Sequence, residues 1–303
     1  MRIIIGSRGS QLALWQANWV KDRLTAAGYE LEIKIIKTTG DKLANIPLTQ
    51  SGTKGLFIKE IEEALVAEEV DLAVHSLKDL PTEQPEGLTV AAVPEREDAR
   101  DVLISKDGCG FSDLPPGARV GTGSLRRQSQ LRRLRADLEI VPMRGNLDTR
   151  LKKLDRGDCE AVVLAAAGVR RLGLADRITE YFSPDQLCSA VGQGALAIEI
   201  RTDDQRMQKV VAPLDHEATH RAVLAERAML CHLGGGCQVP IAAHATLTSE
   251  QLQLVGVVAS LDGSEIVRAS AFGPASEPEA LGATVARSLL EQGARAILES
   301  VRI

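Results

Sequence analysis

Two arginines that follow a glycine-rich turn have types and a spacing that could bind a charged ligand. The turn spans residues 121–124, Gly-Thr-Gly-Ser, with Ser124 at the N-cap of a predicted helix and Arg126 and Arg127 in its first turn. Free backbone N–H groups and two guanidiniums there favour a bound anion, because arginine is otherwise unfavourable at the positive end of a helix. The turn lacks the Gly-Lys-Ser/Thr ending of a P-loop, and a solvated basic turn is the alternative interpretation.

Other arginines lie where predicted strands give way to helices. Arg8 and Ser10 stand just before the first predicted helix, and Arg144, Arg150 and Arg171 follow later strands. Ligands of open α/β sheets bind beyond the carboxyl ends of the strands, and the planar guanidinium suits carboxylates especially well. One such arginine is usually a solvated surface charge. Four at equivalent places, Arg8, Arg126, Arg144 and Arg171, favour a polyanionic ligand.

Asp79 stands just beyond the carboxyl end of a predicted buried strand, residues 71–75, and so near these arginines. A carboxylate fixed there could face a cationic reaction centre. The alternative is a turn residue before Leu80 and Pro81.

The thiol of Cys237 follows three glycines, residues 234–236, which remove bulk around it and let the backbone bend. A buried structural cysteine is the usual interpretation. The flexible, polar approach makes a nucleophile or a point of covalent attachment an equally good interpretation here. The five cysteines are scattered and odd in number, and the N-terminal residues lack the apolar run of a signal peptide. We therefore expect no disulfide framework and a cytoplasmic location.

Residues 216–220, His-Glu-Ala-Thr-His, match the short zinc-peptidase pattern. The extended pattern needs glycine at 223 and histidine at 226, where this chain has Val223 and Glu226. Glu226 could still act as a third ligand, so a zinc peptidase remains a rival hypothesis. Short patterns of this kind often match by chance, and we expect no metal.

Alternating strands and helices must position these residues. The pattern predicts mainly parallel sheets with helices on both faces over the first two-thirds of the chain. The predicted strands are 2–5, 31–37, 71–75, 88–93, 119–121, 138–141 and 161–165, and the predicted helices are 11–26, 57–67, 125–135 and 147–156.

The last third has a different pattern. A helix at 217–230 precedes three alternating runs, and Asp262-Gly263 between the last two is a hairpin signal. These features predict an antiparallel α+β domain made of strands 239–247, 252–259 and 264–271 and a final helix at 277–300.

Composition narrows the class of partner. The 303 residues are 44% hydrophobic and 25% charged, as in ordinary globular proteins. A net charge of -5 disfavours nucleic acid, and no apolar stretch approaches the roughly 18 residues of a membrane span. We expect a small-molecule ligand and neither a nucleic-acid nor a membrane partner.

Seven stretches of this sequence together resemble the porphobilinogen deaminase family and run in that family's order. They are Gly6-Ser-Arg-Gly-Ser-Gln-Leu-Ala-Leu14, Gly55-Leu-Phe-Ile-Lys-Glu60, Ala73-Val-His-Ser-Leu-Lys-Asp-Leu-Pro81, Gly121-Thr-Gly-Ser-Leu-Arg-Arg127, Arg144-Gly-Asn146, Val191-Gly-Gln-Gly-Ala195 and Gly235-Gly-Cys-Gln-Val-Pro240. The resemblance implies two α/β domains like the halves of a periplasmic binding protein, with a cleft between them, and a C-terminal α+β domain with a three-stranded antiparallel sheet. The expected bounds are residues 1–94 with 195–212, residues 95–194, and residues 213–303.

The resemblance also implies an activity. The family's enzyme is a transferase of tetrapyrrole biosynthesis that joins four porphobilinogen units head to tail into linear hydroxymethylbilane and releases ammonia. It uses a dipyrromethane cofactor, which the resemblance places on Cys237 through a thioether, and a catalytic carboxylate, which it places at Asp79. Loss of ammonia leaves a positively charged azafulvene, and a fixed carboxylate stabilises such a charge. The family suggests a monomer.

The same matching implies further site residues. Those expected at the cofactor are Ser76, Lys78, Ser124, Arg126, Arg127, Arg144 and Gln193, and those expected at the substrate are Arg8, Ser10, Lys54, Phe57, Arg150 and Arg171. One departure is Gly234, where the family often has glutamate, so the attachment loop is expected to be looser. A pure anion-binding protein of the periplasmic type is the second rival, but it leaves Cys237 unexplained.

Overall fold

The computed structural model describes residues 2–42, 57–234 and 239–301, and the chain divides into two compact units. The first unit is Met1–Arg96 with Ala195–His220, and the second is Glu97–Gly194 with Arg221–Ile303. The second unit contains both the second α/β sheet and the C-terminal sheet, which the sequence analysis assigns to separate domains. The three-domain division, and the cleft between the first two domains, therefore stay predictions.

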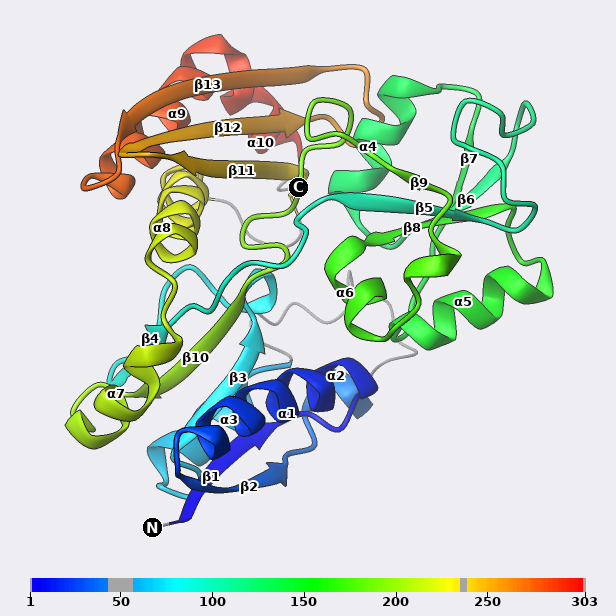
Figure 1. Cartoon of the computed structure of the whole chain (residues 1–303). Helices are drawn as coiled ribbons and strands as arrows, with labels where there is room; N and C mark the ends of the chain where they lie inside the picture. The colour runs from blue at the N-terminus through cyan, green and yellow to red at the C-terminus, as the bar shows by residue number, and fades with distance from the viewer. Residues whose placement is uncertain (1, 43–56, 235–238, 302–303) are drawn as a thin grey trace. The chain divides into compact units, whose positions relative to one another are not determined.

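The first unit is built on a five-stranded sheet in the order β2-β1-β3-β10-β4 (Figure 1). Its strands β1, β2, β3 and β4 run in one direction, and β10 runs against its two neighbours. The mainly parallel sheet is thus confirmed. The strands are β1 (Arg2–Ser7), β2 (Glu30–Ile35), β3 (Leu72–Ser76), β4 (Leu88–Ala92) and β10 (Leu196–Arg201).

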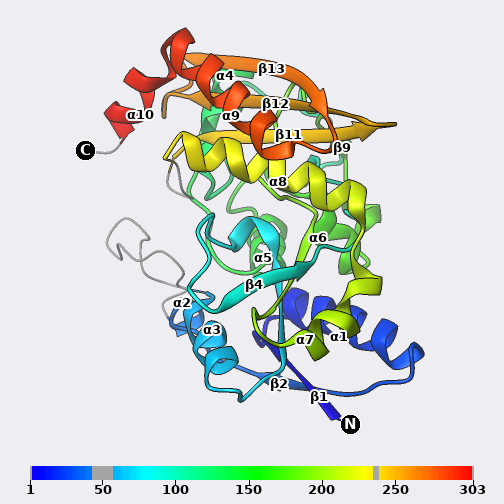
Figure 2. The ribbon, with the colours of Figure 1, turned by 90° about the vertical axis from the view of Figure 1, so that its left-hand side faces the viewer.

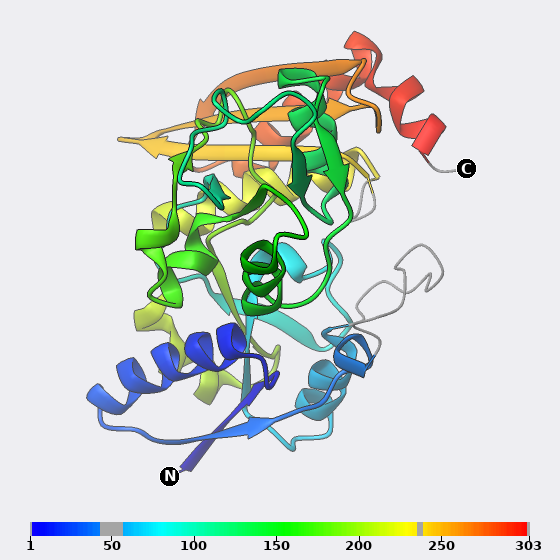
Figure 3. The same ribbon diagram turned by 90° about the vertical axis from the view of Figure 1, so that its right-hand side faces the viewer.

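Helices cover both faces of this sheet, as predicted. Helix α1 (Gln11–Ala26) begins at its N-cap Ser10 and lies along the sheet (blue in Figure 3), and it shares one apolar core with α7 (Gln205–Val211). Helix α3 (Lys59–Val66) packs on the opposite face. Shorter helical segments are α2 (Thr39–Lys42), η2 (Leu77–Asp79) and η4 (Ala212–Leu214).

The second unit repeats the plan with a sheet in the order β7-β6-β8-β5-β9, in which β5 alone runs against its neighbours. Helix α4 (Leu125–Leu134) covers one face, and α5 (Leu147–Arg156) and α6 (Ala166–Arg171) cover the other. Strands β5 and β9 and helix α6 are not among the predicted elements. The strands are β5 (Asp101–Ser105), β6 (Arg119–Gly121), β7 (Glu139–Val141), β8 (Ala161–Ala165) and β9 (Glu180–Tyr181), and η3 spans Ala175–Arg177.

The C-terminal part is a three-stranded antiparallel sheet, as predicted, with helices packed against it (Figure 2). The predicted final helix at 277–300 is wrong in one respect, because Gly293 has a φ of 104° and breaks it through the segment η5 (Leu290–Ala294). The elements are β11 (Ile241–Thr248), β12 (Gln251–Ala259), β13 (Ile266–Pro274), α8 (Glu217–His232), α9 (Pro278–Leu289) and α10 (Arg295–Val301). Among the described helices, none has the length and apolar character needed to cross a membrane.

Candidate functional site

In the first unit, the predicted site residues gather at one edge of the sheet. Strands β1 and β3 are parallel neighbours, so their carboxyl ends lie side by side. Arg8 and Ser10 follow β1, and Ser76 ends β3 and leads into the short turn that carries Lys78 and Asp79. The topology thus brings together residues that lie far apart in the sequence.

Arg8 is held by two neighbours. Its guanidinium donates to Asp41 from Nε at 3.1 Å and from Nη2 at 2.5 Å, and it lies over the ring of Phe57 at 4.2 Å from the centroid. Burial tends to raise the pKa of Asp41, but Arg8 and Thr38 reverse this and hold it below its ordinary value. Arg8 is therefore oriented before any ligand binds, with Phe57 as its platform.

Asp79 is exposed at the end of the turn η2, on a rigid base. The buried Leu77 donates its N–H to the carbonyl of Ala195 at 3.0 Å, and Ser76 accepts a hydrogen bond from Gln16 at 2.8 Å. These contacts attach the turn to Ala195, the residue just before β10, and to helix α1. They place a solvent-facing carboxylate on a backbone that has little freedom to move.

In the second unit, Arg126 and Arg127 point inward onto one buried carboxylate. Arg127 donates to Asp101 Oδ1 from Nε at 3.0 Å and from Nη2 at 2.7 Å. Arg126 Nη1 lies 2.7 Å from Asp101 Oδ2, an ion pair rather than an aligned hydrogen bond. Burial would raise the pKa of Asp101, but the two guanidiniums hold it well below its ordinary value. Asp101 is a site residue that none of the sequence patterns above predicts.

Gln193 and Arg171 extend this cluster. Gln193 Nε2 donates to Asp101 Oδ1 at 2.9 Å, and its Oε1 accepts from Arg127 at 3.4 Å. Arg171 is buried, donates to the carbonyl of Gly194 at 2.7 Å, and has its pKa lowered by burial to about 10. Arg126 and Arg127 against the single carboxylate of Asp101 leave an excess of positive charge, which favours an anionic ligand. Arg171 adds a third guanidinium, whose charge is partly balanced by Glu97.

The remaining cations of this unit follow the parallel strands β6, β7 and β8, whose carboxyl ends share an edge. Ser124 is the N-cap of α4, as predicted, and accepts from the N–H of Arg127 at 3.5 Å. Arg144 follows β7 and is half-buried. Arg150, in the first turn of α5, donates from Nε to the carbonyl of Gly145 at 2.9 Å.

Two predicted site residues, Cys237 and Lys54, lie outside the described residues. The described chain before Cys237 ends at Gly234, which has a φ of 59° and donates its N–H to the carbonyl of Cys231 at 2.9 Å. Glycine adopts this left-handed conformation without the strain that another side chain would bring. The departure from the family's glutamate therefore suits the local backbone.

The two histidines of the His-Glu-x-x-His stretch contact polar side chains near the N-terminus of helix α8. His216 Nδ1 lies 2.8 Å from Thr219 Oγ1, and His220 Nδ1 lies 2.8 Å from Asp215 Oδ1. Glu226, the possible third ligand, instead accepts backbone N–H groups from Gly192 and Ala245. Across the described ranges, no group of three metal-ligating side chains is found.

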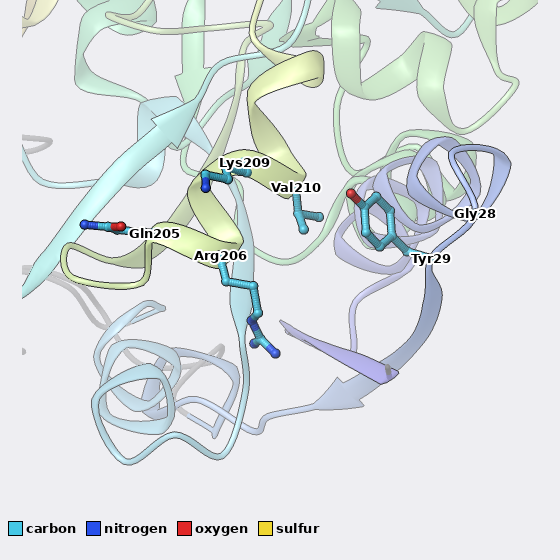
Figure 4. A pocket seen from close by; sticks show the side chains of 6 residues that line it. All are labelled: Gly28, Tyr29, Gln205, Arg206, Lys209 and Val210. Atoms are coloured by element: carbon cyan, nitrogen blue, oxygen red, sulfur yellow. The ribbon is translucent and has the colours of Figure 1, made fainter.

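A surface pocket of about 580 Å³ lies in the first unit, between the end of α1 and helix α7 (Figure 4). None of the predicted site residues lines it. The lining residues are Gly28, Tyr29, Gln205, Arg206, Lys209 and Val210.

Comparison with protein families gives two matches that together cover most of the chain. Residues 3–209 match the family described as porphobilinogen deaminase, dipyrromethane cofactor binding domain. Residues 220–291 match the family described as porphobilinogen deaminase, C-terminal domain.

Curated relatives agree with these matches. The porphobilinogen deaminase of Syntrophobacter fumaroxidans is 51% identical over 301 residues, which cover 99% of this chain and 97% of that protein. The porphobilinogen deaminase of Pelobacter propionicus is 53% identical over 299 residues, which cover 98% of this chain and 96% of that protein.

Two solved structures match this chain at low sequence identity and with TM-scores below 0.5. The methionine binding protein MetQ has a TM-score of 0.46 at 13% identity, covering 72% of this chain and 92% of that one. A periplasmic substrate-binding protein of an ABC transporter from Coxiella burnetii has a TM-score of 0.42 at 14% identity, covering 70% and 91%.

Proposed function

The chain belongs to the porphobilinogen deaminase family, and on that premise we propose that Asp79 and Cys237 are the two residues on which its reaction depends. It is a transferase of tetrapyrrole biosynthesis that joins four molecules of porphobilinogen into linear hydroxymethylbilane and releases ammonia. Its larger matched region is the dipyrromethane cofactor binding domain.

The residues of the second unit fit a dipyrromethane. Each pyrrole ring of that cofactor carries an acetate and a propionate, and the cluster around Asp101 has more positive than negative charge. Arg126 Nε is buried and has no hydrogen-bond partner among the described residues, so it is a donor that a ligand carboxylate could satisfy. The residues that would hold the cofactor are Ser76, Lys78, Ser124, Arg126, Arg127, Arg144 and Gln193.

When bound, the cofactor supplies the anchored pyrrole to which substrate units are added. Asp79 then acts on the substrate: loss of ammonia from porphobilinogen develops positive charge next to a pyrrole ring, and a carboxylate fixed on a rigid turn stabilises that charge. The same carboxylate can take part in proton transfer as the carbon–carbon bond forms. The exposure of Asp79 beside the buried Leu77 supports this role.

Arginines bind the acetate and propionate groups of porphobilinogen in this proposal. Arg8 is already oriented by Asp41 and Phe57. The residues proposed to bind the substrate are Arg8, Ser10, Lys54, Phe57, Arg150 and Arg171. Orientation before binding lowers the entropy that is lost when the substrate docks. Lysine would keep the charge at these positions and lose the planar fork.

The observation that carries the proposed function is the excess of buried guanidiniums within the matched cofactor-binding domain. Purified protein incubated with porphobilinogen should release one ammonia per substrate molecule consumed, with one linear tetrapyrrole formed from four. Binding of porphobilinogen without ammonia release would instead identify an anion-binding protein.

The point of cofactor attachment is a separate part of the proposal. We expect the purified protein to be heavier than its sequence by one dipyrromethane unit, because Cys237 follows three glycines in the sequence and matches the attachment site that the family resemblance implies. Intact-mass measurement should give the bare mass for Cys237→Ser, which should also be inactive.

The matched control is Cys231→Ser, since Cys231 is exposed on α8 only six positions earlier in the sequence. It should keep both the added mass and the activity. A fully active wild-type protein with the bare mass would remove Cys237 from the proposal. We also propose that the protein is cytoplasmic and monomeric. Light scattering after size-exclusion chromatography tests the oligomeric state.

A further inference from the structure

The carboxylate of Asp101 is the most completely enclosed charge in the second unit's site. Asp101 is 0% exposed and is the first residue of β5, where the chain enters the second sheet. Its Oδ1 accepts three hydrogen bonds, two from Arg127 and one from Gln193 Nε2. Its Oδ2 lies against Arg126. A carboxylate out of contact with water is expensive unless its partners compensate it, and here two guanidiniums do so.

The two arginines are held unequally. Arg127 uses all three of its guanidinium nitrogens: besides its two bonds to Asp101, it donates to the carbonyl of Val163 at 3.1 Å and to Gln193. Arg126 uses Nη1 for Asp101 and for the carbonyl of Cys188 at 2.5 Å, while its Nε remains buried without a partner in the described chain. The cluster thus fixes both guanidiniums and leaves a donor on Arg126 for a ligand.

Charge explains why such an arrangement needs Asp101. Arg126 and Arg127 are adjacent in the sequence and both nearly buried, so their positive charges repel each other. A single carboxylate placed against both relieves the repulsion without neutralising the pair. One net positive charge remains for an incoming carboxylate.

We propose that Asp101 is a positioning residue, the internal counter-ion that holds Arg126 and Arg127 in the orientation in which they receive the carboxylates of the dipyrromethane. This inference rests on the proposed function for the identity of the ligand. The orientation of the two guanidiniums is a property of this chain and can be measured without the ligand.

The first experiment follows cofactor loading by intact mass. Asp101→Asn keeps the side-chain shape and one oxygen acceptor but removes the charge, so the rate at which apoprotein gains the dipyrromethane mass from added porphobilinogen should fall about ten- to a hundredfold. The same or a faster loading rate would overturn the proposal, because Asp101 would then be a bystander or a competitor of the ligand.

A matched control uses the neighbouring carboxylate Asp98. Asp98 is paired with Arg100 through Nε at 3.0 Å and Nη2 at 2.7 Å, and it contacts neither Arg126 nor Arg127 in any hydrogen bond or ion pair found in the described chain. Asp98→Asn should load at the wild-type rate. An equal loss of loading in both variants would show a general effect of removing an ion pair, against the proposal.

The second experiment is independent of the cofactor. In the Cys237→Ser background, ¹⁵N NMR should show slowly exchanging Nε–H signals from buried arginines, and Asp101→Asn should speed their exchange at least about tenfold. If the wild-type protein never carries a dipyrromethane, the proposed function fails while this test still decides the role of Asp101. Unchanged exchange rates would overturn that role.

Asp101→Glu covers the case in which Asp101→Asn does not fold. It keeps the negative charge and moves it by one methylene, so it should fold and should load at a rate between those of wild type and the amide variant. Wild-type loading in Asp101→Glu would show that only charge matters and that position does not, which contradicts a positioning role.

Discussion

Two aspartates of this protein show how one residue type serves opposite purposes according to burial. Asp79 faces solvent from a short turn at the end of β3, whereas Asp101 is enclosed by Arg126, Arg127 and Gln193. The negative charge of Asp101 is compensated by the two guanidiniums beside it. The charge of Asp79 is available to a substrate, which is what a catalytic carboxylate requires.

Asp79→Asn is the sharpest test at this scale. The amide keeps size and most hydrogen bonding but removes the charge that stabilises the substrate's cation. Turnover should fall at least about a hundredfold, the order seen when one electrostatic stabiliser is lost, with substrate affinity and thermal stability near those of wild type. Single-turnover ammonia release at saturating porphobilinogen measures the effect.

Asp79→Glu serves as the companion variant, because it retains the charge with a shifted position and should keep part of the activity. Rates for Asp79→Asn within a few-fold of wild type would reduce Asp79 to a turn residue.

The arginines of the site were accessible from the sequence, but their partners were not. Ser124, Arg126 and Arg127 follow a glycine turn, and that local pattern predicts the N-cap and the cations correctly. Asp101 lies 26 positions from Arg127 in the chain and opens a strand whose next three residues are apolar. Only the pairing of β5 beside β8 brings them together, and no local pattern contains that information. The charged residue at the start of a buried run was the one available signal.

At the scale of elements, each five-stranded sheet has four strands that run in one direction and a reversed strand in the fourth place. In both, the parallel strands end at a common edge and carry the site residues there, as expected for open α/β sheets. Helices α1 and α5 have the predicted bounds because their periodicity and caps are local features. Strand β5 is harder to predict from the sequence. A short strand that is buried on both faces lacks the alternation of apolar and polar residues that marks a half-buried strand.

A substitution at Gly194 tests how tightly the segment around Gly194 packs against the segment around Glu97. Its φ is +89°, its carbonyl accepts hydrogen bonds from the N–H of Glu97 and from Arg171, and a Cβ there would lie 2.3 Å from the Glu97 carbonyl oxygen. Gly194→Ala should therefore cost clearly more than the ~1–2 kcal/mol of a left-handed non-glycine residue. Urea unfolding measures the loss.

Gly28→Ala is the matched control, because Gly28 has a φ of +92° and a Cβ added there would meet no atom within 4 Å. It should show the backbone cost alone. Equal losses of unfolding free energy in the two variants would mean that the segment around Glu97 yields to the methyl group.

At the scale of the whole molecule, paired carboxylates in both units set the response to acid. Many carboxylates that are paired or hydrogen-bonded in the fold have a pKa below the ordinary value. Each of them binds its proton less readily in the folded chain than in the unfolded chain. Glu62 is an opposite case, since burial raises its pKa. The carboxylates with a lowered pKa are Asp41, Asp98, Asp101, Asp137, Glu160, Asp204, Asp215 and Asp262.

The sign of this linkage gives a prediction. Stability from the carboxylates with a lowered pKa is present above their unfolded pKa, 3.8 for the aspartates and 4.5 for Glu160, and is lost as pH falls through the folded values. The free energy of urea unfolding should be flat down to about pH 5 and fall steeply below pH 4. Asp101→Asn should have a shallower slope than wild type below pH 4. A slope that stays unchanged would mean that Asp101 is not charged in the folded protein.

The division into units shows the limit of sequence at this scale. The sequence predicts a return of the chain to the first sheet near residue 195, and Ala195 is where the first unit resumes. It does not predict that the C-terminal sheet shares a unit with the second α/β sheet. That association depends on long-range contacts such as the Gly263 hairpin against Ser129 and Ser189 against Ala243.

The place of β10 in the first sheet has a consequence for biosynthesis. β10 fills the gap between β3 and β4, yet β4 ends at Ala92 and β10 begins only at Leu196, after every strand of the second sheet. At ~5–20 residues per second, a ribosome leaves the edges of β3 and β4 unpaired for on the order of 5–20 s. The nascent chain therefore completes its second sheet before its first, and during that interval the unpaired edges are open to chaperones and to aggregation with neighbouring chains.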